Sequence, residues 1–222
     1  MNVEAVCFDL DDTLFEYERY ARAGLNAAGD WLEQETGRQL HDELQELYFE
    51  EEITDGTFDV LTERHDLPGE IVGNLVEAYH SASTPLTPYP ETKAVLSALE
   101  PYERGLVTGG RGGQRKLDRL GLREFFESVI VTPDVDRTKE DPVVFRAILA
   151  ELGVDPERAV YVGDDPRFDF AVPNDLGMET VRLLRGRYTS LEPSSEAAAP
   201  DHGIDHLDRL LVLLDSAGHK KL

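Results

Sequence analysis

The chain has 222 residues, which suits one core domain with a substantial insertion, or two small domains. It carries 45 Asp and Glu against 22 Lys and Arg, so its formal net charge is −23 at pH 7. A surface of this charge repels nucleic-acid phosphates and anionic membranes, and we expect neither as a partner.

The remaining composition indicates a folded cytoplasmic protein. Hydrophobic residues make up 41% of the chain and recur periodically, which excludes a disordered polymer. Cys7 is the only cysteine, so no disulfide can form within the chain. Neither a signal peptide nor a long apolar run is recognisable, which predicts a cytoplasmic location. An acidic excess with only five lysines favours a halophilic protein adapted to a salt-rich cytoplasm, the alternative being an ordinary acidic enzyme.

An acid cluster follows the first predicted strand. Val3–Phe8 is short, apolar and partly β-branched, which predicts a buried strand. Asp9, Asp11 and Asp12 come directly after it, followed by Thr13. Aspartate is a favoured turn residue, but a turn does not require three carboxylates that repel one another. A divalent cation would relieve the repulsion, and Mg²⁺ prefers hard oxygen ligands of this kind.

An all-helical insertion is predicted after this cluster. Apolar residues recur at helical spacing between residues 16 and 83, in about four segments. Residues 84–90 contain three prolines and form a stiff strap that leads back to the core. We therefore assign residues 1–15 and 84–222 to an α/β core domain and residues 16–83 to a helical cap domain.

The second part of the chain alternates between helices and strands. This alternation indicates right-handed βαβ units and hence a doubly wound, Rossmann-like parallel sheet. Residues 186–203 are polar and are predicted to form a loop, with a closing helix over 205–214. The other predicted strands are 105–108, 128–132, 158–162 and 179–183, and the helices around them are 91–100, 114–120, 142–152 and 168–176.

Ligands of a doubly wound sheet bind beyond the carboxyl ends of the strands, so the residues that follow each strand are the candidate site. Thr108 ends one strand, and four glycines occur among residues 109–113, just before a helix. Glycines let the backbone approach an anion, and the helix start offers free N–H groups. A flexible turn is the alternative interpretation of the same pattern.

Two later connections supply a cation and further acids. Lys139 precedes a predicted helix and would neutralise both a phosphate and the acid cluster, although most lysines are solvated surface residues. Asp164 and Asp165 follow the next strand and bring a second pair of acids to the same edge. Asp165 has an alternative role as a helix N-cap, and Asp169 as a residue at the helix start.

Taken in order, these segments resemble the four motifs of the haloacid dehalogenase (HAD) superfamily. The segment Asp9–Thr13, DLDDT, matches the first motif, DxDxT or DxDxV. Thr108 and Lys139 match the second and third motifs, and Gly163-Asp164 with Asp169 matches the fourth. The helical insertion stands where the small cap lies in the subfamily of phosphoglycolate phosphatase and YjjG-like nucleotidases. The resemblance thus covers essentially the whole chain and implies a Rossmann-like HAD core.

The resemblance implies a Mg²⁺-dependent phosphatase that acts on a small phosphorylated metabolite. Asp9 would be the nucleophile that forms an aspartyl-phosphate. Asp11 would protonate the leaving oxygen and then deprotonate the water that hydrolyses the intermediate. Mg²⁺ would be held by Asp9, by the backbone carbonyl of Asp11 and by Asp164.

The resemblance also implies how the phosphoryl group is held. Thr108, the backbone amide of Gly109 and Lys139 would bind its oxygens, and Asp169 would orient Lys139 or a metal-bound water. Two positions depart from the family pattern. Gly109 replaces a frequent Asn, which removes a side chain that can reach the substrate, and Glu140 replaces a frequent Pro.

Four alternatives stay open on the sequence. One is a pseudoenzyme kept only for binding, although no motif carboxylate or lysine is missing. A phosphomutase shares all four motifs. A haloacid dehalogenase shares the nucleophile but needs no acid at the second motif position, where this chain has Asp11. A phospho-accepting receiver also gathers acids, a threonine and a lysine around Mg²⁺, but its acceptor follows a later strand and it has no helical insertion. Neither the particular substrate nor the oligomeric state can be deduced from the sequence.

Overall fold

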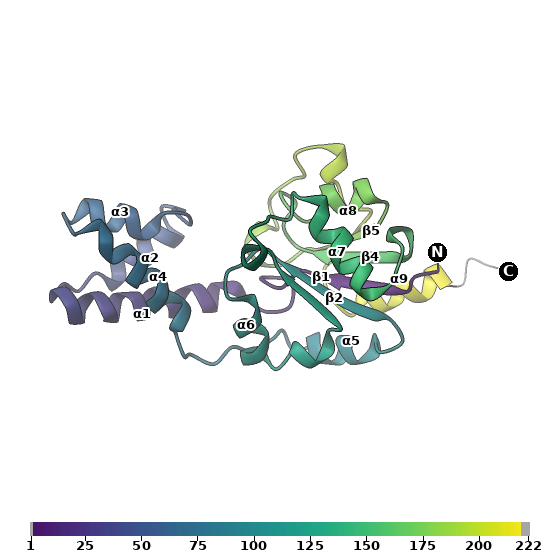
Figure 1. The fold of residues 1–222 in the computed structure, drawn as a ribbon, viewed down its shortest axis with the longest axis horizontal. Coiled ribbons are helices and arrows are strands. Elements are labelled where there is room, and N and C mark those ends of the chain that lie inside the picture. The colour runs from purple at the N-terminus through teal and green to yellow at the C-terminus, as the bar shows by residue number, and fades with distance from the viewer. Residues whose placement is uncertain (1, 219–222) are drawn as a thin grey trace. The chain divides into compact units, whose positions relative to one another are not determined.

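The computed structural model describes residues 2–218. The chain divides into two compact units (Figure 1): Met1–Tyr17 with Leu86–Leu222, called the core below, and Glu18–Pro85, called the insert. Among the described residues, no helix has the length and apolar character needed to cross a membrane.

The core is built on one six-stranded parallel sheet in the order β3-β2-β1-β4-β5-β6. The first strand lies at the centre of the sheet, and all four of its side chains are buried. The chain winds outward from β1 in one direction to β3, and from β4 in the other direction to β6, so the topological switch point lies between β1 and β4. The strands are β1 (Ala5–Phe8), β2 (Glu103–Thr108), β3 (Ser128–Val131), β4 (Ala159–Gly163), β5 (Glu179–Leu183) and β6 (His202–Ile204).

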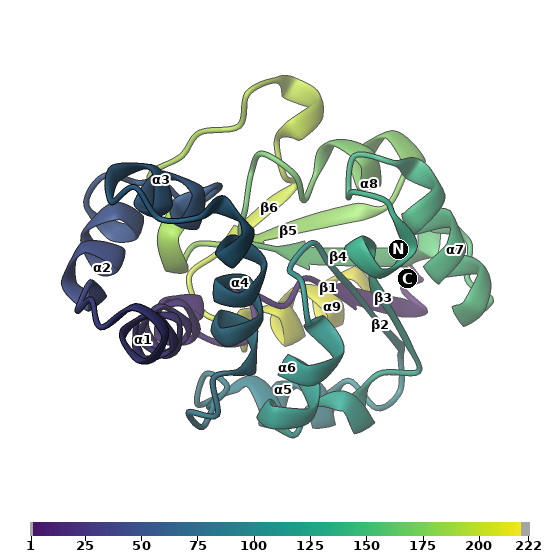
Figure 2. The same ribbon diagram turned by 60° about the vertical axis from the view of Figure 1, so that its left-hand side comes forward.

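Helices cover both faces of this sheet. Figure 2 shows α7 and α8 on one face and α5, α6 and α9 on the other. The predicted doubly wound α/β fold is therefore confirmed. The helices of the core are α5 (Thr92–Ala98), α6 (Gly113–Leu120), α7 (Pro142–Leu152), α8 (Ala171–Leu176) and α9 (Arg209–Gly218).

Helix α7 illustrates how local sequence builds this core. Asp141 caps the helix, since its carboxylate accepts a 2.9 Å hydrogen bond from the N–H of Val143. Pro142 occupies the first helical position, where the missing N–H costs nothing. The buried face of the helix packs on the sheet. The rings of Phe145 and Tyr161 meet edge to face, with their centroids 5.1 Å apart. The helix that precedes β4 is thus fixed at its start, next to Lys139.

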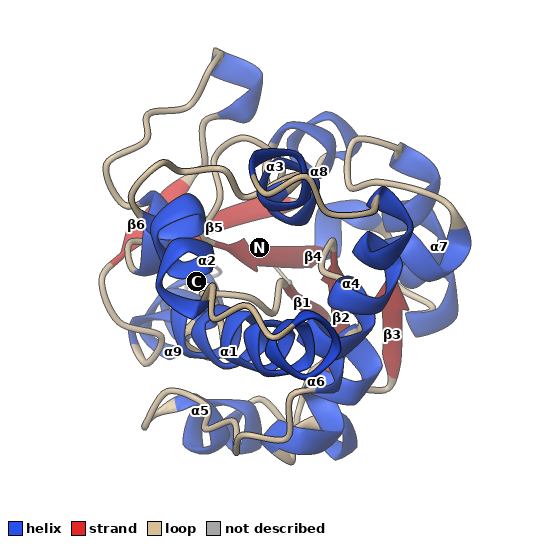
Figure 3. Cartoon of the chain, turned by 90° about the vertical axis from the view of Figure 1, so that its left-hand side faces the viewer, coloured by secondary structure: helices blue, strands red, loops and turns tan. Residues whose placement is uncertain are grey.

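The insert is helical throughout its regular structure, as Figure 3 shows by colour. Leucine is the commonest of its buried hydrophobic residues, with Leu25, Leu32, Leu44 and Leu47 as examples at helical spacing. Its helices are α1 (Tyr17–Thr36, of which Tyr17 belongs to the core unit), α2 (His41–Phe49), α3 (Thr57–Arg64) and α4 (Val72–Ser81), with a short 3₁₀ turn, Gly69–Ile71, before α4.

The structure differs from the sequence-based expectation at the end of the chain. Residues 186–203 were expected to form a loop, but His202–Ile204 is strand β6. The strand has only three residues and includes a glycine, so no alternating pattern marks it; its place is set by pairing with β5. The closing helix begins at Arg209 and not at residue 205, and α8 begins at Ala171 and not at residue 168.

Candidate active site

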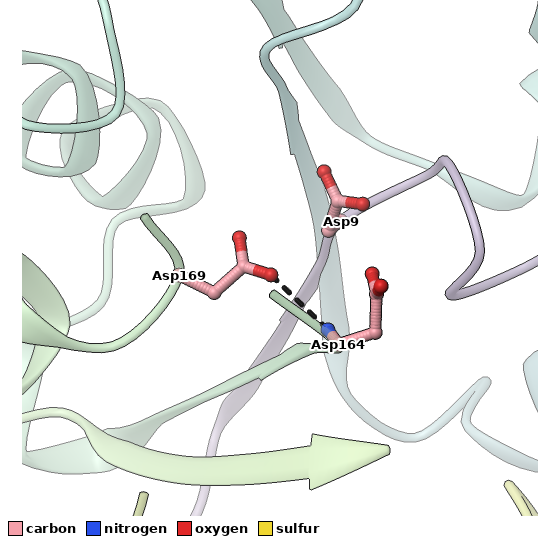
Figure 4. A group of neighbouring side chains, drawn as sticks. All are labelled: Asp9, Asp164 and Asp169. Atoms are coloured by element: carbon pink, nitrogen blue, oxygen red, sulfur yellow. Dashed lines mark hydrogen bonds between the residues drawn. The ribbon is translucent and has the colours of Figure 1, made fainter. Parts of the chain in front are cut away.

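Asp9 and Asp164 lie at the switch point of the sheet. Asp9 directly follows β1, and its N–H donates a 2.8 Å hydrogen bond to the carbonyl of Val162 in β4. Asp164 directly follows β4. Both side chains are buried, and together with Asp169 they offer carboxylate oxygens that lie within 4.8 Å of one another (Figure 4). The ends of two neighbouring strands and the loop after β4 therefore gather three buried acids.

Lys139 lies between two of these acids. Its ammonium donates to Asp9 Oδ1 and, at 2.6 Å, to Asp169 Oδ1. Burial raises the pKa of Asp9 to about 7, an effect that the neighbouring ammonium only partly offsets. Burial alone would lower the pKa of Lys139, but the carboxylates of Asp169 and Asp9 outweigh it, and the pKa lies well above the ordinary value. Lys139 is therefore a permanent positive charge at the site.

Asp169 uses both of its carboxylate oxygens within the protein. Oδ1 accepts from Lys139 and from the hydroxyl of Tyr161 at 3.3 Å. Oδ2 accepts from the N–H groups of Asp164 and Asp165, at 3.1 and 2.9 Å. Gly163 makes this approach possible, because a Cβ at that position would lie 2.4 Å from Asp169 Oδ2. Asp169 is thus placed to orient Lys139 and the loop after β4.

The chemistry of Asp164 fits a divalent cation. Its Oδ1 accepts a 3.0 Å hydrogen bond from the hydroxyl of Thr13, whereas its buried Oδ2 has no hydrogen-bond partner within the described part of the chain. Burial and the charges of Asp169 and Asp9 raise the pKa of Asp164 well above the usual range. A buried carboxylate oxygen without a partner is costly, and a bound cation removes that cost. Asp9 and Asp164 therefore suit Mg²⁺, which takes oxygen ligands.

The glycine-rich loop begins at the end of β2, beside β1. Thr108 is fully buried, and its hydroxyl accepts a hydrogen bond of 3.3 Å from the N–H of Gly110. Gly109 borders open space, because an added Cβ would meet no atom within 4 Å. Crowding therefore does not explain why Gly109 replaces the asparagine that is frequent in the HAD pattern.

Asp11 does not join the other carboxylates. Its side chain forms a separate ion pair with Lys116, whose ammonium donates to both oxygens at 2.8 and 2.7 Å. Lys116 lies on α6 and is buried, with only 2% of its side chain exposed, whereas the carboxylate-bearing side chain of Asp11 is 15% exposed. Sequence reasoning missed Lys116. The available signal was its position on the apolar face of a helix, one residue before Leu117 and four before Leu120.

Asp12 and Asp165 each contact an arginine. Asp12 accepts from Arg187 Nε at 2.5 Å and from the N–H of Tyr17 at 3.0 Å. Asp165 accepts from Arg167, at 2.9 Å from Nε and at 2.8 Å from Nη2. The alternative role of Asp165 as the N-cap of α8 is excluded, since that helix begins after Phe170. These arginines were not singled out from the sequence, and no motif marks them.

Comparison with known proteins supplies independent information. Residues 3–176 match the family model described as haloacid dehalogenase-like hydrolase. A glyceraldehyde 3-phosphate phosphatase of Methanopyrus kandleri is 36% identical, over 94% of this chain and 96% of that protein. A ribulose-1,5-bisphosphate 5-phosphatase of Halopiger xanaduensis is 32% identical, over 95% of this chain and 98% of that protein. The crystal structure of a HAD phosphatase from Thermococcus onnurineus superposes with a TM-score of 0.69 at 28% identity, over 96% of this chain and 98% of that one.

Proposed function

Because this chain belongs to the haloacid dehalogenase-like hydrolase family, we propose that it is a Mg²⁺-dependent phosphatase that works through an aspartyl-phosphate on Asp9. Membership of a hydrolase family was predicted from the sequence and is confirmed. The observation that carries the proposal is the placement of Asp9 at the switch point, buried against Lys139 and beside Asp164. The relatives named above support a small phosphorylated sugar or triose as the substrate.

In the first step, a carboxylate oxygen of Asp9 attacks the phosphorus, and the bond from phosphorus to the leaving oxygen breaks. The carboxyl group of Asp11 gives its proton to that oxygen, which departs as an alcohol. The hydroxyl of Thr108, the N–H of Gly109 and the ammonium of Lys139 hold the other phosphoryl oxygens. Lys139 suits this role because it carries a positive charge even though it is buried.

In the second step, water attacks the phosphorus of the aspartyl-phosphate. Asp11, now a carboxylate, takes the proton of the water, the bond from phosphorus to Asp9 breaks, and inorganic phosphate and free Asp9 result. When bound, Mg²⁺ supplies the positive charge that brings an anionic phosphate against an anionic nucleophile. Asp9, Asp164 and the backbone carbonyl of Asp11 would hold it.

Asp11 favours a phosphatase over a haloacid dehalogenase. The dehalogenase reaction releases a halide, which needs no proton, so it has no use for an acid two residues after the nucleophile. This chain has Asp11 at that position and pairs it with a buried lysine. The ion pair fixes the position of the Asp11 carboxylate, and the acid at this position in the motif is what favours a phosphatase.

We assign substrate selection to the insert. Glu18–Pro85 is a compact unit with its own buried leucines, and two chain crossings join it to the core. A helical unit joined in this way suits a lid that closes over the substrate. If the insert is replaced by a short Gly/Ser linker, we expect activity on a true metabolite to fall far more than activity on an aryl phosphate. Equal losses on both substrates would remove the insert from substrate selection.

A panel of phosphorylated metabolites tests the proposed function most directly. The panel should include glyceraldehyde 3-phosphate and ribulose 1,5-bisphosphate, with and without Mg²⁺ and over a range of salt concentrations. We expect release of inorganic phosphate from at least one member, only with Mg²⁺, and not by the Asp9→Asn variant. Transfer of the phosphoryl group to a second sugar phosphate in place of water would point to a phosphomutase instead.

We place this enzyme in a salt-rich cytoplasm. The net charge of −23 supports this assignment, and so does a single cysteine that is buried in β1 and out of reach of disulfide exchange. An optimum of phosphatase activity at low salt would contradict the halophilic assignment.

A further inference from the structure

We propose that Lys116 is a positioning residue: it holds the Asp11 carboxylate in the orientation from which Asp11 gives and takes protons. The inference rests on the proposed function, because it concerns the acid and base of that reaction. No motif of the family pattern described above includes Lys116, and the sequence places it in the middle of a helix that follows the glycine-rich loop.

The first argument is the geometry of the ion pair. The ammonium contacts both carboxylate oxygens, at 2.8 and 2.7 Å, so it fixes the rotation of the carboxylate as well as its position. Burial of the lysine distinguishes this pair from the surface ion pairs of the protein, such as Arg22 with Glu18, whose partners are 50% and 44% exposed. Exposed pairs of that kind contribute little because water and salt screen them.

The second argument is the shape of the space around the pair. A Cβ at Gly110 would lie 2.3 Å from Asp11 Oδ2 and 2.8 Å from Lys116 Nζ, so the pair lies directly against the backbone of the glycine-rich loop. The ammonium also lies 4.9 Å from the centre of the Tyr17 ring. Three segments of the core, residues 11–17, the loop and α6, therefore enclose the pair.

The third argument is the charge pattern of the site. Asp11 is two residues from Asp9 along the chain. Lys139 forms ion pairs with Asp9 and Asp169, and Lys116 forms an ion pair with Asp11. Each of the two reacting carboxylates thus has its own buried ammonium. Since proton transfer depends steeply on the position of the acid, loss of this contact should slow the reaction without removing the nucleophile.

The leaving group of the substrate separates this role from a merely structural one. An alkyl phosphate needs a proton on its departing oxygen, whereas 4-nitrophenyl phosphate releases a stable anion and needs little help. For Lys116→Met we expect kcat/KM to fall about 10- to 100-fold for the alkyl phosphate and less than about 3-fold for 4-nitrophenyl phosphate. Lys93→Met is the matched control, because Lys93 is exposed on α5 outside the site, and it should change neither value.

A double variant provides the second readout. If Lys116 acts through Asp11, Lys116→Met should cause no further loss of alkyl phosphatase activity in an Asp11→Asn background. Additive losses, or equal losses on both substrates by Lys116→Met alone, would overturn the inference. If Lys116→Met does not fold, Gly110→Ala takes its place: it keeps both charges, displaces the pair and should show the same selectivity for the alkyl phosphate.

The Asp9→Asn variant keeps the two proposals apart. If it is inactive and the Lys116 variants show no difference between substrates, the inference about Lys116 fails and the phosphatase mechanism stands. If Asp9→Asn stays active, or if the natural protein hydrolyses neither phosphate, the proposed function fails and the inference fails with it.

Discussion

The carboxyl end of the sheet contains two buried lysine–aspartate pairs, and they differ in their surroundings. Lys139 lies between Asp9 and Asp169, and each of the three side chains is less than about one-tenth exposed. Lys116 pairs with Asp11, whose side chain is 15% exposed. The two aspartates thus lie two positions apart on one segment, but Asp9 is more deeply buried than Asp11.

This difference matches two chemical tasks. A nucleophile is best held in a defined position away from bulk water, and the burial of Asp9 and its ion pair with Lys139 suit this task. An acid that becomes a base must exchange protons with the leaving group and with water, so its carboxylate has to reach the open side of the site. The comparison therefore predicts that changes at the two pairs will differ in kind, beginning with the nucleophile.

The largest effect is expected for Asp9→Asn. The substitution keeps the size of the side chain and a hydrogen-bond acceptor for Lys139, but it removes the attacking charge. Turnover should fall by roughly 10⁴-fold or more, while folding survives. Steady-state release of phosphate and a far-UV spectrum would check both halves of the expectation. Turnover within about tenfold of that of the natural protein would end the covalent mechanism.

Replacing each of the two buried lysines by methionine should destabilise the protein to different extents. Lys139→Met leaves Asp9 and Asp169 buried without a counter-charge, which should cost about 3–5 kcal/mol of the free energy of unfolding. Lys116→Met should cost less, because the exposed side of Asp11 gives its carboxylate access to water. Urea unfolding of both variants without Mg²⁺ measures the difference. A larger loss of unfolding free energy for Lys116→Met than for Lys139→Met would contradict the conclusion that the Lys139 pair is the more deeply buried one.

The two pairs also mark how far the sequence predicts the site. Asp9 and Asp164 come just after a strand, Thr108 is the last residue of a strand, and Lys139 comes shortly before a helix. Parallel strands bring such positions to one edge of the sheet. The fold was predictable for the same reason, because alternating strands and helices leave few topologies open. Local pattern and topology together were enough to bring Asp9, Lys139 and Asp164 together.

Lys116 and the arginines were not predictable in this way. Whether Lys116 is buried depends on which face of α6 packs on the core and on the space that the missing side chain of Gly110 leaves for the ion pair. Both depend on the three-dimensional packing. Arg187 contacts Asp12 across 175 positions of sequence, and no periodicity records such a contact. Strand β6 was missed for a related reason, since three residues are too few for a pattern and pairing with β5 defines it.

Asp11→Asn should have a smaller effect than Asp9→Asn. The amide cannot give or take a proton, so turnover should fall by about 10²- to 10³-fold. Because Asp9 is intact, some enzyme should accumulate as the aspartyl-phosphate when an aryl phosphate is the substrate. Acid quenching after brief exposure to a ³²P-labelled aryl phosphate detects that species. If Asp11→Asn does not slow turnover, the dehalogenase interpretation returns.

Mg²⁺ should stabilise the sealed side of the site. Binding to Asp9 and Asp164 would raise the free energy of unfolding by about 2.7 kcal/mol at 100 times the dissociation constant, which corresponds to about 5–11 °C in Tm. The shift should be larger at pH 8 than at pH 6, because burial raises the carboxyl pKa values and protons then compete with the ion. Asp164→Asn is the informative control, and a shift of normal size in that variant would place the ion elsewhere.

Salt should separate the buried pairs from the acidic surface. A net charge of −23 means self-repulsion that weakens the compact state when screening is poor, so Tm should rise by a few degrees from low to molar KCl. Buried pairs are screened much less than surface charges, because the ions of the solution do not reach them. The natural protein and Lys139→Met should therefore show the same slope of Tm against salt, displaced by a constant amount. Differential scanning calorimetry on both measures the slopes. A slope that differs between the two would show that salt reaches the Asp9 site, and a flat response in both would remove the halophilic interpretation.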